Sequence, residues 1–257
     1  MPSHVLCAIL LLAATACSTP LAWRPAGGSL AHYRQSFEDA VGQQIVAEAS
    51  LTDIVAMAQD HAVVWLGDHH YSDRLHVLQR DVLTLLQQSG RPLLLLLEAI
   101  GEQDGPAVAD YVAGRTNEEQ LRTRMRRRWP GSWLDDEELD APHYRALLAF
   151  ARHHAIPVRA LEPTPRLPLA ARDARIATTV RTIAAEHADR LLVAVLGQAH
   201  LLGVGDVVAR SGVPGLVIGG IPPATLRATA PAVSARDRLH RSDGGVWWFG
   251  ALLAPQP

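Results

Sequence analysis

Four short apolar runs, each followed directly by polar side chains, constrain the fold of this chain more than any other feature. They cover residues 62–66, 93–97, 156–161 and 191–196, and amphipathic segments with helical spacing separate them. None alternates apolar with polar residues, which is typical of strands buried on both faces. We therefore predict an α/β fold with a mostly parallel central sheet and helices on both faces. A last strand, antiparallel and at an edge, is expected over residues 246–253.

Polar side chains gather where these predicted strands end. The first strand is followed by Gly67-Asp68-His69-His70 and the fourth by Gly197-Gln198-Ala199-His200, so a Gly-x-x-His pattern occurs twice. Glu98 and Glu162 end the other two strands. Ligands of parallel sheets bind beyond the carboxyl ends of the strands. These residues are therefore expected to line one crevice.

The residue types in this crevice suit a divalent metal. His70, His200 and Glu98 offer the imidazole and carboxylate ligands that zinc accepts. A catalytic site would also need a general base for a metal-bound water, and Asp68 or Glu162 could serve. A single histidine at a strand end is more often a hydrogen-bonded structural residue. A non-catalytic scaffold with polar strand ends therefore stays an alternative.

Composition and absent motifs exclude several other classes. Apolar residues make up 48% and charged residues 19% of the chain, values of a globular protein with a sizeable core. The formal net charge of −2 gives no reason to expect a nucleic-acid partner. The sequence contains no Gly-x-Ser-x-Gly, P-loop or Gly-x-Gly-x-x-Gly motif. An α/β-hydrolase, an NTPase and a dinucleotide enzyme are therefore not expected.

The N-terminal segment is predicted to direct export. Residues 5–16 are apolar or small, too few to span a bilayer but suited to a signal peptide. Ala14-Thr15-Ala16 before Cys17 resembles a bacterial lipobox, so lipidation of Cys17 is expected; the alternative is ordinary cleavage with Cys17 incidental. Lipidation would anchor the protein in the bacterial cell envelope, in the outer membrane or facing the periplasm. The predicted division is a signal peptide at 1–16, a lipid-anchored tether at 17–30 and a single domain at 31–257.

Taken in order, these motifs resemble the ChaN-like haem-binding lipoproteins. That family lies in a wider group with the TIKI, TraB and erythromycin-esterase-like proteins, marked by two Gly-x-x-His motifs and a glutamate after a strand. The resemblance extends over about residues 42–220. It is carried by residues 63–70, 78–79, 93–98, 149–152, 156–158 and 195–200. The first motif of the family usually reads Gly-Glu-x-His, whereas Asp68 stands here. A carboxylate one methylene shorter changes the reach of that side chain.

The resemblance implies haem as cofactor and partner, in haem or iron uptake or handling. It does not identify the axial ligand of the iron. His69, His70, Tyr71 and His200 are candidates, because histidine and tyrosine both serve as haem ligands. The wider group implies the alternative of a metal-dependent hydrolase that uses His70, Glu98 and His200. A homodimer is left open.

Overall fold

The computed structural model describes residues 29–41, 45–128, 133–136, 139–220, 238–242 and 245–249. The predicted signal peptide, Cys17 and most of the tether lie outside these residues. None of the described helices has both the length and the apolar character needed to cross a bilayer.

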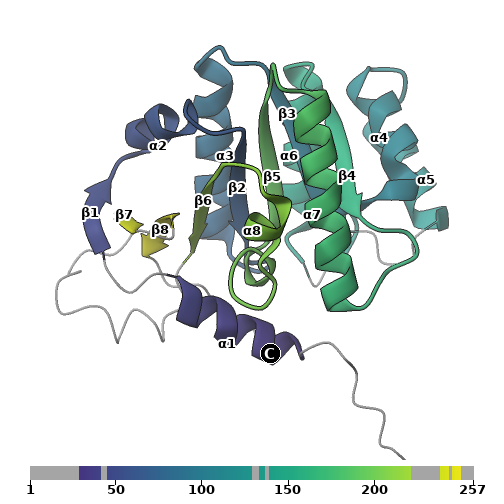
Figure 1. The fold of residues 1–257 in the computed structure, drawn as a ribbon. Coiled ribbons are helices and arrows are strands. Elements are labelled where there is room, and N and C mark those ends of the chain that lie inside the picture. The colour runs from purple at the N-terminus through teal and green to yellow at the C-terminus, as the bar shows by residue number, and fades with distance from the viewer. Residues whose placement is uncertain are drawn as a thin grey trace, which may run out of the picture.

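Within the described residues, eight strands form one sheet in the order β1-β7-β8-β6-β2-β5-β3-β4 (Figure 1). From β8 to β4 all neighbouring strands are parallel, whereas β7 pairs antiparallel with both β8 and β1. The predicted α/β class with a mostly parallel sheet is confirmed, and the four apolar runs form neighbouring strands of it. The strands are β1 (Ile45–Ala49), β2 (Val63–Asp68), β3 (Leu93–Gly101), β4 (Val158–Glu162), β5 (Leu191–Gly197), β6 (Gly215–Gly220), β7 (Arg238–Ser242) and β8 (Gly245–Phe249).

Helices cover both faces of the sheet (Figure 1). A capping box begins helix α2: the Ser50 side chain accepts from the Asp53 amide, and the Asp53 carboxylate accepts from the Ser50 amide. The helices are α1 (Leu30–Ala40), α2 (Leu51–Ala58), α3 (Asp73–Gln88), α4 (Gly105–Val112), α5 (Glu118–Arg128), α6 (Ala141–His153), α7 (Leu169–Glu186) and α8 (Val207–Ser211), with short 3-10 turns η1 (Glu102–Asp104) and η2 (Gln198–His200).

Alternate residues of the central strands enter two different cores. Val64 and Leu66 of β2 pack with apolar side chains of α2 to α6. Val63 and Trp65 of the same strand pack with side chains of α1, α7 and α8. Burial of both faces removes any need for polar alternation, which explains the continuous apolar runs.

The edge beyond β6 differs from the expectation. The predicted antiparallel edge strand is β8, which is parallel to β6 and has β7 and β1 outside it. The prediction failed because neither outer strand has a long apolar run. β1 has three apolar residues before the exposed Glu48, and β7 reads Arg-Leu-His-Arg-Ser. Helix α1 follows directly on the predicted tether and buries Tyr33 and Phe37 against the sheet domain.

Candidate functional site

Both Gly-x-x-His motifs lie at the carboxyl ends of adjacent parallel strands, β2 and β5. A Cβ atom placed on Gly197 would lie 3.3 Å from Glu98 Oε2, 3.3 Å from His200 Cδ2 and 3.6 Å from His70 Cε1. The glutamate and the two histidines therefore surround one point, at the crevice that the sequence predicts. A side chain at position 197 would crowd them, so glycine is needed here for close approach.

His70 is held by the buried carboxylate of Asp68. His70 Nδ1 lies 2.9 Å from Asp68 Oδ2, which also accepts a 2.7 Å hydrogen bond from the Tyr144 hydroxyl. Asp68 Oδ1 lies 2.8 Å from His76 Nε2. Burial alone would raise the pKa of Asp68, but the hydrogen bonds from His70 and His76 outweigh it and hold that pKa well below its ordinary value. Asp68 is therefore an ionised acceptor.

The other side of the His70 ring is available for a ligand. Its side chain is 31% exposed, and Nε2 forms no hydrogen bond to any described residue. Donation from Nδ1 to Asp68 leaves the lone pair on Nε2. The Trp133 ring meets the imidazole edge-on at 4.6 Å, and the Tyr71 ring lies 6.5 Å away. His70 thus offers a basic nitrogen beside aromatic side chains.

His200 is oriented in the same way but is enclosed. Its Nδ1 lies 2.8 Å from Asp173 Oδ1, and both residues are buried. Arg172 Nη1 lies 3.5 Å from His200 Nε2, so a guanidinium faces the second ring nitrogen. The Tyr33 ring of α1 lies 5.5 Å from the imidazole. Burial and the nearby Asp173 charge raise the pKa of Tyr33 to about 12, which keeps the phenol neutral.

One buried guanidinium joins the remaining predicted residues. Arg172 Nε donates to Glu162 Oε2 at 2.7 Å, and Arg172 Nη2 contacts Glu98 Oε1. Glu98 Oε2 accepts from the Gly197 amide at 2.5 Å. Burial raises the pKa of Glu162 to about 7, against the lowering effect of the Arg166 guanidinium, and the bond from Arg172 also favours the ionised form. Arg172 therefore supplies the positive charge that these carboxylates need.

His69 and Tyr71 flank His70 in the sequence, and all three residues are half-buried. Burial lowers the pKa of His69, and its Nδ1 is buried without a hydrogen bond to any described residue. Tyr71 is partly exposed, with its ring 6.3 Å from His69 and 6.5 Å from His70. Of the four candidate haem ligands, His69, His70 and Tyr71 are half-buried neighbours, whereas His200 is buried.

The three residues predicted to hold a metal surround Gly197, but tighter groupings of ligand atoms lie elsewhere. In the described part of the chain, two groups have ligand atoms within 4.8 Å of one another: Asp68 with His76 and His143, and Asp73 with His76 and Asp140. Both groups lie on the α3 and α6 side of Asp68.

Sequence reasoning missed the partners that orient the predicted residues. Tyr144 and His76 were not distinguishable from helix surface, although Tyr144 has the i+3 and i+4 spacing to Leu147 and Leu148 of a buried face. Arg172 and Asp173 precede the buried Ile176 on α7 in the same way. Helical periodicity was the signal that could have placed the side chains of Tyr144, Arg172 and Asp173 inside.

Comparisons with known proteins agree with the motifs. A family model described as haem-binding uptake, Tiki superfamily, ChaN matches residues 54–168. No curated protein matches the sequence. The type III effector HopBA1 is similar in structure, with 15% identity, a TM-score of 0.54, and coverage of 82% of this chain and 99% of its own.

ChaN of Campylobacter jejuni, solved with cofacially bound haem, has 9% identity and a TM-score of 0.47, covering 67% of this chain and 86% of its own. The effector domain RRSP of a Vibrio vulnificus toxin has 17% identity and a TM-score of 0.48, covering 72% and 37%. At these identities structural likeness concerns the fold alone. The matched residues 54–168 include the first Gly-x-x-His motif and Glu98, and over them the chain resembles the ChaN-like haem-binding family of the Tiki superfamily.

Proposed function

We propose that this chain is an exported, lipid-anchored haem-binding protein of the bacterial cell envelope that acts in haem or iron uptake or handling. The observation that carries the proposal is His70: its Nδ1 is fixed by Asp68 at 2.9 Å, and its Nε2 is free of hydrogen bonds to the described residues. The match of residues 54–168 to a haem-binding family supports the same ligand. The lipid anchor, the envelope location and a homodimer stay predictions from the sequence.

The residues around His70 fit haem chemically. A histidine whose Nδ1 donates to a carboxylate is a well-oriented and more basic ligand for a metal through Nε2. Trp133 and Tyr71 place aromatic rings beside it, suited to an apolar macrocycle. We assign His70 as the axial ligand and Tyr71 as the second candidate. His200 is the weakest candidate because it is buried and its Nε2 faces Arg172.

A metal-dependent hydrolase is the second candidate function. The convergence of His70, Glu98 and His200 around Gly197 favours it. Arg172 opposes it, because the guanidinium already contacts Glu98 and lies beside His200 Nε2. A divalent ion with these ligands would meet that positive charge or have to displace it.

A haem titration of the chain from residue 18 onward separates these functions. We expect saturable uptake with a Soret band distinct from that of free haem, and no stoichiometric zinc in the purified protein. A Tyr71→Phe variant serves as control, because it removes the second candidate ligand and keeps the aromatic ring; its Soret band should match that of the wild type. Absence of saturable haem uptake, with stoichiometric zinc present, would replace the haem proposal with the hydrolase.

A further inference from the structure

His76 is a buried histidine of α3 held between two carboxylates. Its Nδ1 lies 2.6 Å from Asp140 Oδ2, and its Nε2 lies 2.8 Å from Asp68 Oδ1. Ionised carboxylate oxygens only accept hydrogen bonds, so both ring nitrogens must donate and the ring is an imidazolium. Burial alone would lower the pKa of His76, but its bonds to Asp68 and Asp140 and their charges raise it.

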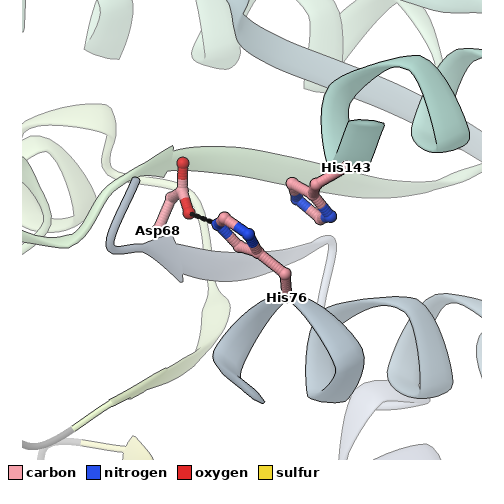
Figure 2. A group of neighbouring side chains, drawn as sticks. All are labelled: Asp68, His76 and His143. Carbon is pink, nitrogen blue, oxygen red and sulfur yellow. Dashed lines mark hydrogen bonds and ion pairs between the residues drawn. The ribbon is translucent and has the colours of Figure 1, made fainter. Parts of the chain in front are cut away.

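A second imidazole lies parallel to this one. Figure 2 shows His143 of α6 beside His76. The ring centroids are 3.9 Å apart, and the ring planes are 2° from parallel. Arg80 Nη1 lies 3.2 Å from His143 Nδ1, and a guanidinium can only donate, so that nitrogen is an acceptor. Burial and the positive charge of His76 lower the pKa of His143 to about 3, so this ring is neutral.

The parallel stacking argues against one ion held by Asp68, His76 and His143. Imidazole lone pairs lie in the plane of the ring, and two parallel planes do not converge on a single point. Both His76 nitrogens are also engaged with carboxylates. His76 therefore has to act through Asp68, which contacts both His76 and the candidate ligand His70.

We infer that His76 is a positioning residue that fixes His70 in the tautomer with hydrogen on Nδ1 and the lone pair on Nε2. A continuous chain of contacts supports this: Asp140 to His76, His76 to Asp68, and Asp68 to His70. His76 engages Asp68 Oδ1, while Tyr144 and His70 share Oδ2. With both oxygens engaged, the carboxylate cannot turn away from His70. The inference rests on the proposed function only where it makes His70 the iron ligand.

Among the described residues, His76 is the only cation that is hydrogen-bonded to Asp68. From α6 and its N-cap come Asp140, His143 and Tyr144, and from α3 come Asp73 and Arg80. Tyr144 is a neutral donor, because burial and the Asp68 charge raise its pKa. Loss of His76 would leave Asp68 Oδ1 buried without its donor. The Asp68 carboxylate would then be held less firmly in its orientation toward His70.

The test is the ¹⁵N NMR spectrum of the histidine rings in the haem-free chain from residue 18 onward. In the wild type we expect two protonated nitrogens on His76 and the Nδ1–H tautomer for His70. In His76→Gln the His70 signals should move toward the Nε2–H tautomer. Asp140→Asn should move them in the same direction but less, and it keeps the helix N-cap because asparagine caps as well as aspartate.

Asp73→Asn is the matched control, because it removes a carboxylate near His76 that forms no hydrogen bond with it in the described structure. Unchanged His70 signals in His76→Gln and Asp140→Asn would overturn the inference, as would a His76 ring with one protonated nitrogen in the wild type. If His76→Gln does not fold, Asp140→Asn alone decides.

A haem titration of the same variants tests the proposed function separately. Loss of a residue that orients a metal ligand typically lowers metal affinity about 10- to 100-fold. We expect His76→Gln to lower the haem affinity by a factor in this range. If the tautomer of His70 shifts as expected while the wild type itself takes up no haem, the positioning role stands and the haem function fails. If the wild type binds haem and the tautomer does not shift, the positioning role fails alone.

Discussion

Arg172 and Arg175 occupy successive turns of α7, and each pairs with glutamate in a different environment. Arg172 is buried and bonded to Glu98 and Glu162, whereas Arg175 is 53% exposed and lies 3.2 Å from Glu102. Breaking a buried ion pair leaves an uncompensated charge in the interior. When an exposed pair is broken, water solvates the remaining charge. We expect Arg172→Met to lower the free energy of unfolding by about 3–5 kcal/mol.

Arg175→Met is the control, with an expected loss of at most about 1 kcal/mol. Urea denaturation of both variants gives the comparison. Equal losses would mean that Arg172 does not neutralise the carboxylates of the site.

At the residue scale the sequence predicts the strand-end residues but not their partners. His70, Glu98 and His200 could be predicted because a parallel sheet brings the ends of its strands to one edge. Asp173 and Tyr144 belong to helices, and their distance from the site depends on how α7 and α6 pack. That packing is a tertiary property, which a local pattern does not contain.

At the element scale, helix α1 packs closely against Gly203 in the loop that follows η2. Gly203 has φ +69°, and a Cβ there would lie 2.4 Å from Ser36 Oγ and 2.5 Å from Ser36 O. Gly90 also has positive φ, at +84°, with nothing within 4 Å of its Cβ position. We expect Gly90→Ala to cost about 1–2 kcal/mol from backbone strain, and Gly203→Ala about 1–3 kcal/mol more from overpacking against α1.

Thermal or urea unfolding of the two alanine variants measures this difference. A Gly203→Ala variant no less stable than Gly90→Ala would mean that α1 is not packed as described. Helix α1 itself could have been predicted, because Tyr33, Phe37 and Val41 recur at i, i+4 and i+8 and are all buried. Strands β1 and β7 could not, because β1 is only five residues long with Glu48 exposed and β7 is mostly polar. Such sequences acquire strand structure only by pairing.

At the scale of the whole molecule, His143 should make stability depend on pH. Its pKa falls from 6.5 to about 3 on burial, so the folded state favours the neutral ring. The stability gained from this is present above pH 6.5 and is lost as the pH falls toward 3. His76 has a raised pKa and acts in the opposite sense, losing its contribution as the pH rises above 6.5.

His143→Phe removes the first effect and keeps a ring beside His76. As the pH falls from about 7 to about 4, the unfolding free energy of the wild type should decrease relative to that of the variant. Urea denaturation across this range isolates His143, because the carboxylates that also titrate are common to both proteins. A difference that stays constant with pH would show that His143 is not buried in neutral form.

Export and anchoring are also properties of the whole molecule. Because Cys17 follows a lipobox-like Ala14-Thr15-Ala16, we expect Cys17→Ser to leave the protein unprocessed or to release it from the membrane fraction. Membrane fractionation and the mass of the product measure this. Unchanged processing and fractionation would leave an ordinary signal peptide as the better explanation.

The haem spectra of His70→Ala and His200→Ala, side by side, test the central claim most directly. Much of haem's affinity would come from burial of its macrocycle, at about 25 cal/mol per Å², so neither variant should lose haem completely. We predict weaker binding and a shifted Soret band for His70→Ala, and an unshifted band for His200→Ala, whose imidazole faces Arg172. A wild type without haem binding, or a shift in His200→Ala and none in His70→Ala, would contradict the assignment of His70 as the haem ligand.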